Sequence, residues 1–176
     1  SYAGSTEGVL VQLHATGATV SGGDAAGDVL NYQGNTPLGL IGSAEADTLG
    51  GFSSNGFTFT GGGGADTFQI LAVVPSSAPI GYTITDFSLA DGDLIDLRMI
   101  GATRDQFQIL DGGLLITNPG GVTATIRVFL ENVDGPIFPT NVLYAQAVSG
   151  ANHTDPSGGA LSGGAGNDHL FGDAGL

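Results

Sequence analysis

Apolar residues recur at regular intervals along the first half of the chain. Steps of ten and nine residues alternate between Leu30, Leu40, Leu49, Phe59 and Phe68. An apolar position that returns every 19 residues, with a second one midway, predicts a coil of two half-turns, each contributing a short strand with an inward residue. Successive coils are expected to add one strand to each of two parallel sheets.

The pattern differs on either side of these coils. Val9, Val11 and Leu13 alternate with residues on the opposite face, which predicts a half-buried strand over residues 8–14. Beyond Phe68, strand-like segments separated by turn signals cover 82–87, 94–97, 107–110, 114–117, 122–130 and 142–148. We expect these segments to form antiparallel strands that cap the last coil, because an open end would expose a sheet edge and an apolar interior.

The sequence therefore predicts an all-β fold, a parallel β-roll of about 19-residue coils capped by antiparallel β strands. Residues 1–73 are expected to form the coils and residues 74–148 the cap. A small, polar linker is expected at 149–160, and residues 161–176 are expected to start a second β-roll. The chain begins without Met and ends inside a repeat, so we expect it to be a piece of a longer polypeptide.

Aspartates follow the same period as the apolar residues. Asp28, Asp47 and Asp66 are spaced 19 residues apart, and an apolar residue follows each of them two positions later. Glycine-rich loops such as residues 61–64 allow turns that side chains forbid, and carboxylate and carbonyl oxygens are the ligands that Ca²⁺ prefers. We therefore predict calcium along one edge, while Pro, Asn and Gly form the turns of the other edge. An ordinary turn acid remains the alternative for Asp47.

Residues 61–68 and 163–170 both match the nonapeptide pattern G-G-x-G-x-D-x-U, in which U is a large apolar residue. On these motifs the chain resembles the RTX family, secreted calcium-binding proteins exported by type I systems. The resemblance implies a calcium-stabilised roll in which Ca²⁺ lies between successive coils, held by repeat aspartates and loop carbonyls. The metal-binding residues that it implies are Asp66, Gly61, Gly62, Gly64, Asp47, Asp28, Asp168, Gly163, Gly164 and Gly166. The 19-residue coil departs from the usual 18, which leaves the number of calcium ions open.

Net charge narrows the range of partners. The chain has 17 acidic residues against three cations and a formal net charge of −14. This balance disfavours nucleic acid and anionic membrane surfaces and favours cations. No cysteine is present, so neither disulfides nor thiolate metal sites are available. No apolar run of 18 residues is present, so membrane insertion is not expected.

A second acidic cluster contains Asp86, Asp91, Asp93 and Asp96. It is interpreted either as a further cation site or as a set of capped turns. The family resemblance also leaves calcium-dependent self-cleavage at Asp155-Pro156 open.

No catalytic residues are predicted, and the chain is not expected to be an enzyme. The three histidines lack zinc-helix spacing, and neither a G-x-S-x-G elbow nor a thiol nucleophile exists. The expected function is that of a calcium-dependent structural module of a large secreted or cell-surface protein, such as an adhesin, surface layer or filament, that folds on Ca²⁺ after type I export. The alternative is a carbohydrate-binding or accessory module of an extracellular enzyme such as a protease, lipase or epimerase.

Expected partners are calcium ions and neighbouring copies or modules of the same protein. Carbohydrate is disfavoured because most aromatic residues fall at core positions. Only Tyr32, Tyr82 and Phe129 are candidates for an exposed aromatic surface.

Overall fold

The computed structural model describes residues 1–14, 17–26, 38–52, 56–71, 75 and 78–145. All of them belong to one compact unit, Ser1–Gln146, and the remaining residues, Ala147–Leu176, are assigned to a second unit. The predicted linker and second repeat block lie outside the described residues. Within the described part of the chain, no helix is long and apolar enough to span a membrane.

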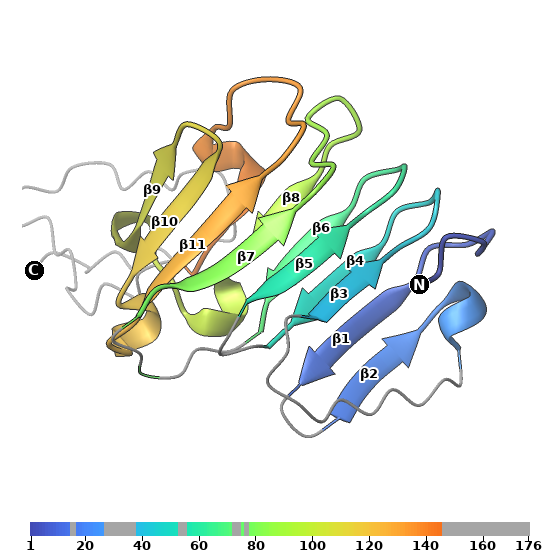
Figure 1. Ribbon diagram of the computed structural model, residues 1–176, viewed down its shortest axis with the longest axis horizontal. Coiled ribbons are helices and arrows are strands. Elements are labelled where there is room, and N and C mark those ends of the chain that lie inside the picture. The colour runs from blue at the N-terminus through green and yellow to red at the C-terminus, as the bar shows by residue number, and fades with distance from the viewer. Residues whose placement is uncertain (15–16, 27–37, 53–55, 72–74, 76–77, 146–176) are drawn as a thin grey trace, which may run out of the picture. The chain divides into compact units, whose positions relative to one another are not determined.

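Two six-stranded sheets make up the described unit (Figure 1). In spatial order, sheet 1 contains β12 (Val142–Leu143), β8 (Leu94–Asp96), β6 (Thr67–Ile70), β4 (Thr48–Gly51), β1 (Leu10–His14) and β2 (Gly17–Ser21). Sheet 2 contains β3 (Leu38–Ile41), β5 (Phe57–Thr60), β7 (Ile80–Ile84), β11 (Thr125–Leu130), β10 (Gly113–Thr117) and β9 (Phe107–Leu110). The described residues also form short 3₁₀ helices, namely η1 (Gly23–Ala25), η2 (Arg98–Ile100), η3 (Arg104–Gln106), η4 (Pro119–Gly121) and η5 (Pro139–Asn141).

The predicted fold class is wrong. An all-β parallel β-roll capped by antiparallel strands was expected, whereas the described residues form a mixed α/β fold of two mixed, mostly parallel sheets with few helices. Strands β7, β8 and β12 pair in parallel with their neighbours, and the antiparallel pairs β1–β2, β9–β10 and β10–β11 lie inside the same two sheets. Turns between sheets and turns within a sheet use the same Gly, Pro and Asn residues, so turn signals alone do not distinguish a crossover from a hairpin.

Chain crossings between the two sheets create the core. Paired residues of β3 and β5, and of β4 and β6, are 19 apart, as in Leu40↔Phe59 and Leu49↔Phe68. All four of these side chains are buried between the sheets. Phe59 packs on Phe68, with ring centroids 5.9 Å apart. The inward positions predicted for these four residues are therefore confirmed, while Leu30 lies outside the described residues.

Candidate functional site

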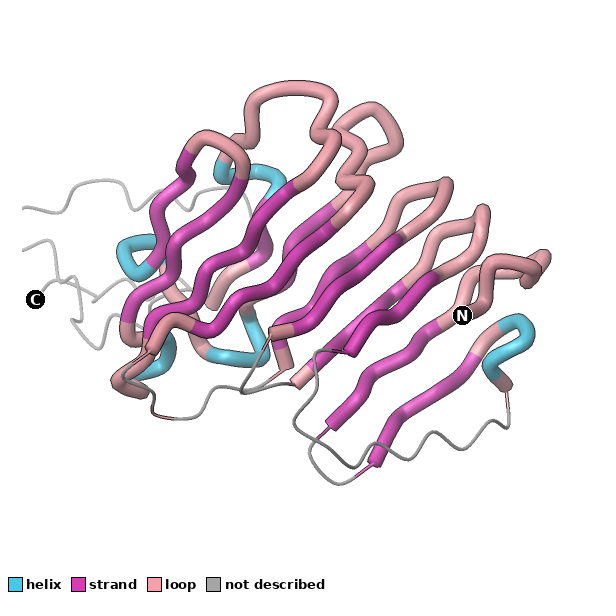
Figure 2. The backbone as a smooth tube through the Cα atoms, in the orientation of Figure 1, coloured by secondary structure: helices cyan, strands magenta, loops and turns pink. Residues whose placement is uncertain are grey.

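Three loops lie side by side where strands of sheet 2 cross to sheet 1 (Figures 1 and 2). They are residues 42–47, 61–66 and 85–93, which connect β3 to β4, β5 to β6 and β7 to β8. Because neighbouring strands run in parallel here, equivalent ends of the strands meet at one edge. We call these three loops the aspartate edge.

Buried carboxylates connect the aspartate edge from one loop to the next. Asp93 Oδ1 accepts a hydrogen bond from the N–H of Asp66 at 2.8 Å, and Asp66 Oδ1 accepts one from the N–H of Asp47 at 2.9 Å. Asp47 Oδ1 in turn accepts the N–H of Val9 at 2.7 Å. The three side chains are at most 2 % exposed. This aspartate ladder satisfies one backbone N–H just before each of β1, β4 and β6.

Other carboxylate oxygens close the turns themselves. Asp47 Oδ2 accepts the N–H of Ser43, and Asp93 Oδ2 accepts the N–H of Ser88 at 2.9 Å. The carboxylate of Asp86 accepts the N–H groups of both Gly61 and Gly62, each at 2.9 Å. Asp47 and Asp93 therefore each bind a backbone N–H of their own loop, and Asp86 joins its loop to the neighbouring loop 61–66.

Close stacking of the loops explains the glycines of the repeat. Gly62 has a φ of +106° and Gly64 a φ of +87°, conformations that side chains rarely adopt. A methyl group at Gly62 would collide with the carbonyl of Ser43, and one at Gly61 would collide with the carboxylate of Asp66. Contact with the preceding loop at Gly62 and Gly64, and contact with Asp66 at Gly61, therefore leave no room for a side chain at these three positions.

Other acidic side chains surround the buried Asp66 and disfavour its ionised form. Burial, followed by repulsion from Asp93, Asp47 and Asp86, raises the pKa of Asp66 to about 7 although the Asp47 N–H lowers it. Burial likewise raises the pKa of Asp93. Among the described residues no Arg pairs with a ladder carboxylate, and the ion pair found there joins Arg98 to Asp96. The ladder therefore lacks a cationic side chain to offset its charge.

Oxygen atoms of adjacent loops converge at the aspartate edge. A methyl group at Gly42 would collide with both the carboxylate of Asp47 and the carbonyl of Gly61. Carboxylate and carbonyl oxygens are the donors that Ca²⁺ takes, so the donor chemistry fits this ion. Within the described ranges, however, no three His, Cys, Asp or Glu side chains gather where they could share one metal ion. A bound ion would therefore rely on one or two carboxylates and on loop carbonyls.

The structure brings together five of the residues predicted to bind metal, namely Asp47, Asp66, Gly61, Gly62 and Gly64. Asp28, Gly163, Gly164, Gly166 and Asp168 lie outside the described residues. The 19-residue period predicts that the strand following Asp28 precedes β4 in sheet 1.

Val9, 38 residues before Asp47, donates to the Asp47 carboxylate instead, because β1 pairs with β4. The first strand of the chain thus takes the place in sheet 1 that the 19-residue period assigned to the segment after Asp28.

The second acidic cluster does not form one group. Asp93 belongs to the ladder, Asp86 binds the Gly61–Gly62 turn, and Asp91 is exposed. Asp96 is bound by Arg98 at 2.8 Å and by Gln69 at 3.1 Å. Burial favours a higher pKa for Asp96, but the hydrogen bonds from Arg98 and Gln69 outweigh it and lower that pKa.

Sequence reasoning missed Asp93 as a ladder member, although a signal was present. Asp93-Leu94-Ile95 repeats the Asp-x-apolar order of Asp66-Thr67-Phe68, and Ile95 pairs with Phe68 in sheet 1. The separation of 27 residues between the two aspartates, in place of 19, concealed the equivalence.

Comparison with known proteins adds no assignment. No family model matches this chain, and neither the curated proteins nor the solved structures contain a match. The resemblance to the RTX family stays a prediction that rests on the repeat motifs.

Proposed function

We propose that this chain is a calcium-stabilised structural module of a larger secreted or cell-surface protein related to the RTX family. The observation that carries the proposal is the aspartate ladder, in which buried carboxylates stack one strand apart without an arginine partner among the described residues. Buried like charges are costly unless a counter-ion or a proton offsets them. A divalent cation that prefers oxygen ligands supplies the missing charge.

The residues that would hold calcium are Asp47 and Asp66, together with the carbonyls of Ser43 and Gly61. These groups belong to two adjacent loops, and the Gly42 position shows that oxygens from both loops approach one another there. When bound, calcium would supply positive charge between the loops. The chain itself contributes the glycine turns that let the loops approach and the N–H groups that orient the carboxylates.

Extracellular calcium levels suit this role. Extracellular calcium modules bind with a Kd on the order of 10⁻⁴ to 10⁻³ M, so such sites fill outside the cell. Each site filled to about ten times its Kd adds about 1.4 kcal/mol to stability by mass action. Calcium bound after export would therefore add to the stability of the folded module, in line with the expected type I route.

Thermal unfolding followed by circular dichroism tests the proposal. We expect calcium to raise the midpoint of the wild-type chain above its value in chelator, and magnesium to raise it less. Asp47→Asn should lose most of this calcium response, measured against its own midpoint in chelator, whereas the exposed turn variant Asp111→Asn should keep it. Identical midpoints of the wild-type chain in calcium and in chelator would contradict the proposal.

A further inference from the structure

The outer face of sheet 2 differs in charge from the rest of the chain. Outward positions on its strands alternate with buried ones, as the burial of β5, β7 and β11 shows. Those positions include Thr58, Thr60, Thr83, Leu115, Arg127 and Phe129. In the described strands of sheet 2 none of the outward positions carries a carboxylate, although the chain has 17 acidic residues. Two copies can therefore approach through this face with less local repulsion than a net charge of −14 imposes elsewhere.

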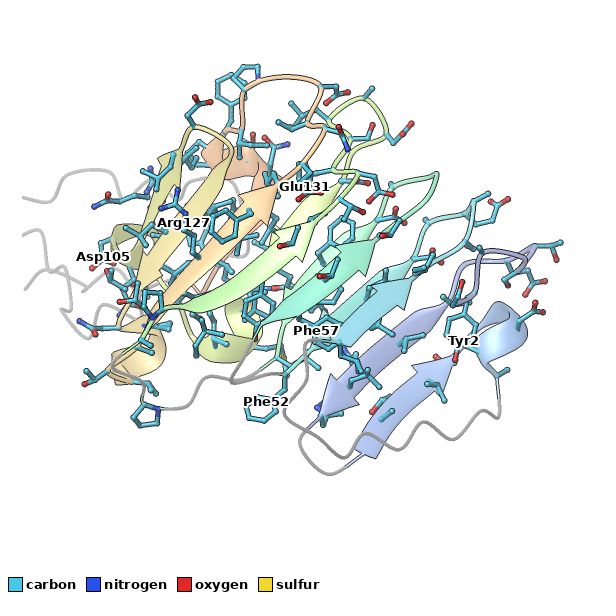
Figure 3. The ribbon with its side chains drawn as sticks, viewed as in Figure 1. Tyr2, Phe52, Phe57, Asp105, Arg127 and Glu131 are labelled. Carbon is cyan, nitrogen blue, oxygen red and sulfur yellow. The ribbon has the colours of Figure 1, made fainter. Side chains whose placement is uncertain are left out.

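Apolar side chains on this face are exposed to solvent. Phe129 on β11 is 42 % exposed and Ile41 on β3 is 43 % exposed. The ring of Phe129 lies beside Gly81 of the neighbouring strand, and the guanidinium of Arg127 lies over it, 4.9 Å from its centroid. Arg127 has no acidic partner among the described residues. Figure 3 labels Arg127 on β11 and Glu131 just beyond the end of that strand.

Charge along β11 is self-complementary. Arg127, Phe129 and Glu131 are spaced two residues apart, and all three are exposed. A two-fold axis through Phe129 would place Arg127 of each copy opposite Glu131 of the other, with the two Phe129 rings in contact at the centre. Sheets pack face to face with their strands roughly aligned, which this arrangement allows. We propose that the outer face of sheet 2 binds the same face of a second copy of this chain.

A neutral polysaccharide fits the same face less well. Sugar recognition uses an open aromatic surface, whereas the guanidinium of Arg127 lies over one side of the Phe129 ring. Tyr82, another aromatic candidate from the sequence, is buried at 1 % exposure, and Tyr32 lies outside the described residues. The described part of the face therefore has one exposed aromatic ring, and that ring is not open on both sides.

Sedimentation velocity of the full chain, from low to high micromolar concentration, tests the inference. The wild-type chain should sediment as a monomer–dimer equilibrium, and Phe129→Glu should sediment as a monomer. Met99→Glu is the matched control, because Met99 is 58 % exposed on η2, which follows β8 of sheet 1 and contacts β6 of that sheet, and this variant should dimerise like wild type. Circular dichroism establishes that each variant is folded.

A charge exchange tests the two-fold arrangement. Arg127→Glu and Glu131→Arg should each weaken the dimer about tenfold, and the double variant should restore it. A monomeric wild type, dimerisation by Phe129→Glu equal to wild type, or a double variant weaker than both single variants would overturn the proposal. The proposal would also be overturned if the wild-type chain stayed monomeric and bound a neutral polysaccharide, and if Phe129→Glu abolished that binding. Sedimentation is measured both in calcium and in chelator, which separates the dimer proposal from the calcium proposal. Equal dimerisation in both conditions would support the dimer whether or not calcium stabilises the chain.

Discussion

Replacing the middle member of the aspartate ladder separates the effect of charge from the effect of shape. Asp66→Asn removes the negative charge and keeps a carbonyl oxygen that can accept the N–H of Asp47, now at 2.9 Å from Asp66 Oδ1. The side chain is 1 % exposed, so water does not screen the charge that is removed. The substitution therefore measures what the ionised carboxylate costs in the folded chain.

Linkage between protonation and folding gives the size of that cost. Burial and the neighbouring Asp93, Asp47 and Asp86 raise the pKa of Asp66 from 3.8 to about 7. A pKa raised by folding means that the folded state binds the proton more tightly, so the stabilisation is complete below the unfolded pKa and is lost as the pH rises through the folded pKa. With 1.36 kcal/mol for each pKa unit, the ionised group costs on the order of 4 kcal/mol above neutral pH.

The assay is urea unfolding in chelator at about pH 5 and about pH 8, followed by circular dichroism. The free energy of unfolding of wild type should be lower at about pH 8 than at about pH 5. That of Asp66→Asn should depend less on pH and should be higher than that of wild type at about pH 8. Calcium should narrow or reverse this difference, because only wild type retains the carboxylate. Asp111→Asn, at an exposed turn, should follow wild type throughout. If Asp66→Asn proves less stable than wild type at the higher pH in chelator, the carboxylate is not the source of the cost.

Three further substitutions test other parts of the fold by thermal or chemical unfolding. Gly62→Ala should cost about 2 kcal/mol or more through strain at its positive φ and collision with the preceding loop, whereas Gly39→Ala, with no atom nearer than 3.5 Å, should be close to neutral. Arg98→Met should cost about 1–2 kcal/mol at neutral pH by removing the partner of buried Asp96. That loss should shrink as the pH falls through the lowered pKa of Asp96, since protonation removes the need for a partner. Phe59→Ala should cost about 3–5 kcal/mol because the ring is fully buried, and a smaller loss would mean that the core closes around the vacancy.

Hydrophobic spacing predicted the repeated strands where the coil length is constant. Leu40, Leu49, Phe59 and Phe68 keep the period, and each is buried at the expected phase. Short-range alternation also predicted β1, in which Val11 and Leu13 are buried. These signals depend on which side of a strand faces the core, and sequence period records that directly.

Pairing partners between distant segments were not predictable in the same way. Asp28 and Val9 both precede apolar strand patterns, and nothing local shows that β1 pairs with β4. The parallel direction of β7 and β12 was missed for a related reason, since direction depends on how far the connecting loop travels. Asp93 was assigned to a local acidic cluster because the longer spacing hid its equivalence with Asp66.

Lengthening of the later coil is unevenly distributed between its two edges. On the edge opposite the aspartates, the step between inward residues grows from ten, between Leu49 and Phe59, to 16, between Phe68 and Ile84. Across the aspartate edge the step grows only from nine, between Phe59 and Phe68, to 11, between Ile84 and Ile95. A carboxylate that must reach the N–H of the neighbouring strand, about 4.8 Å away, leaves little room for inserted residues. The sequence of the opposite edge, residues 52–56 and 71–79, contains no Asp or Glu that could make such a bond, so insertion there is expected at a small cost in loop-closure entropy.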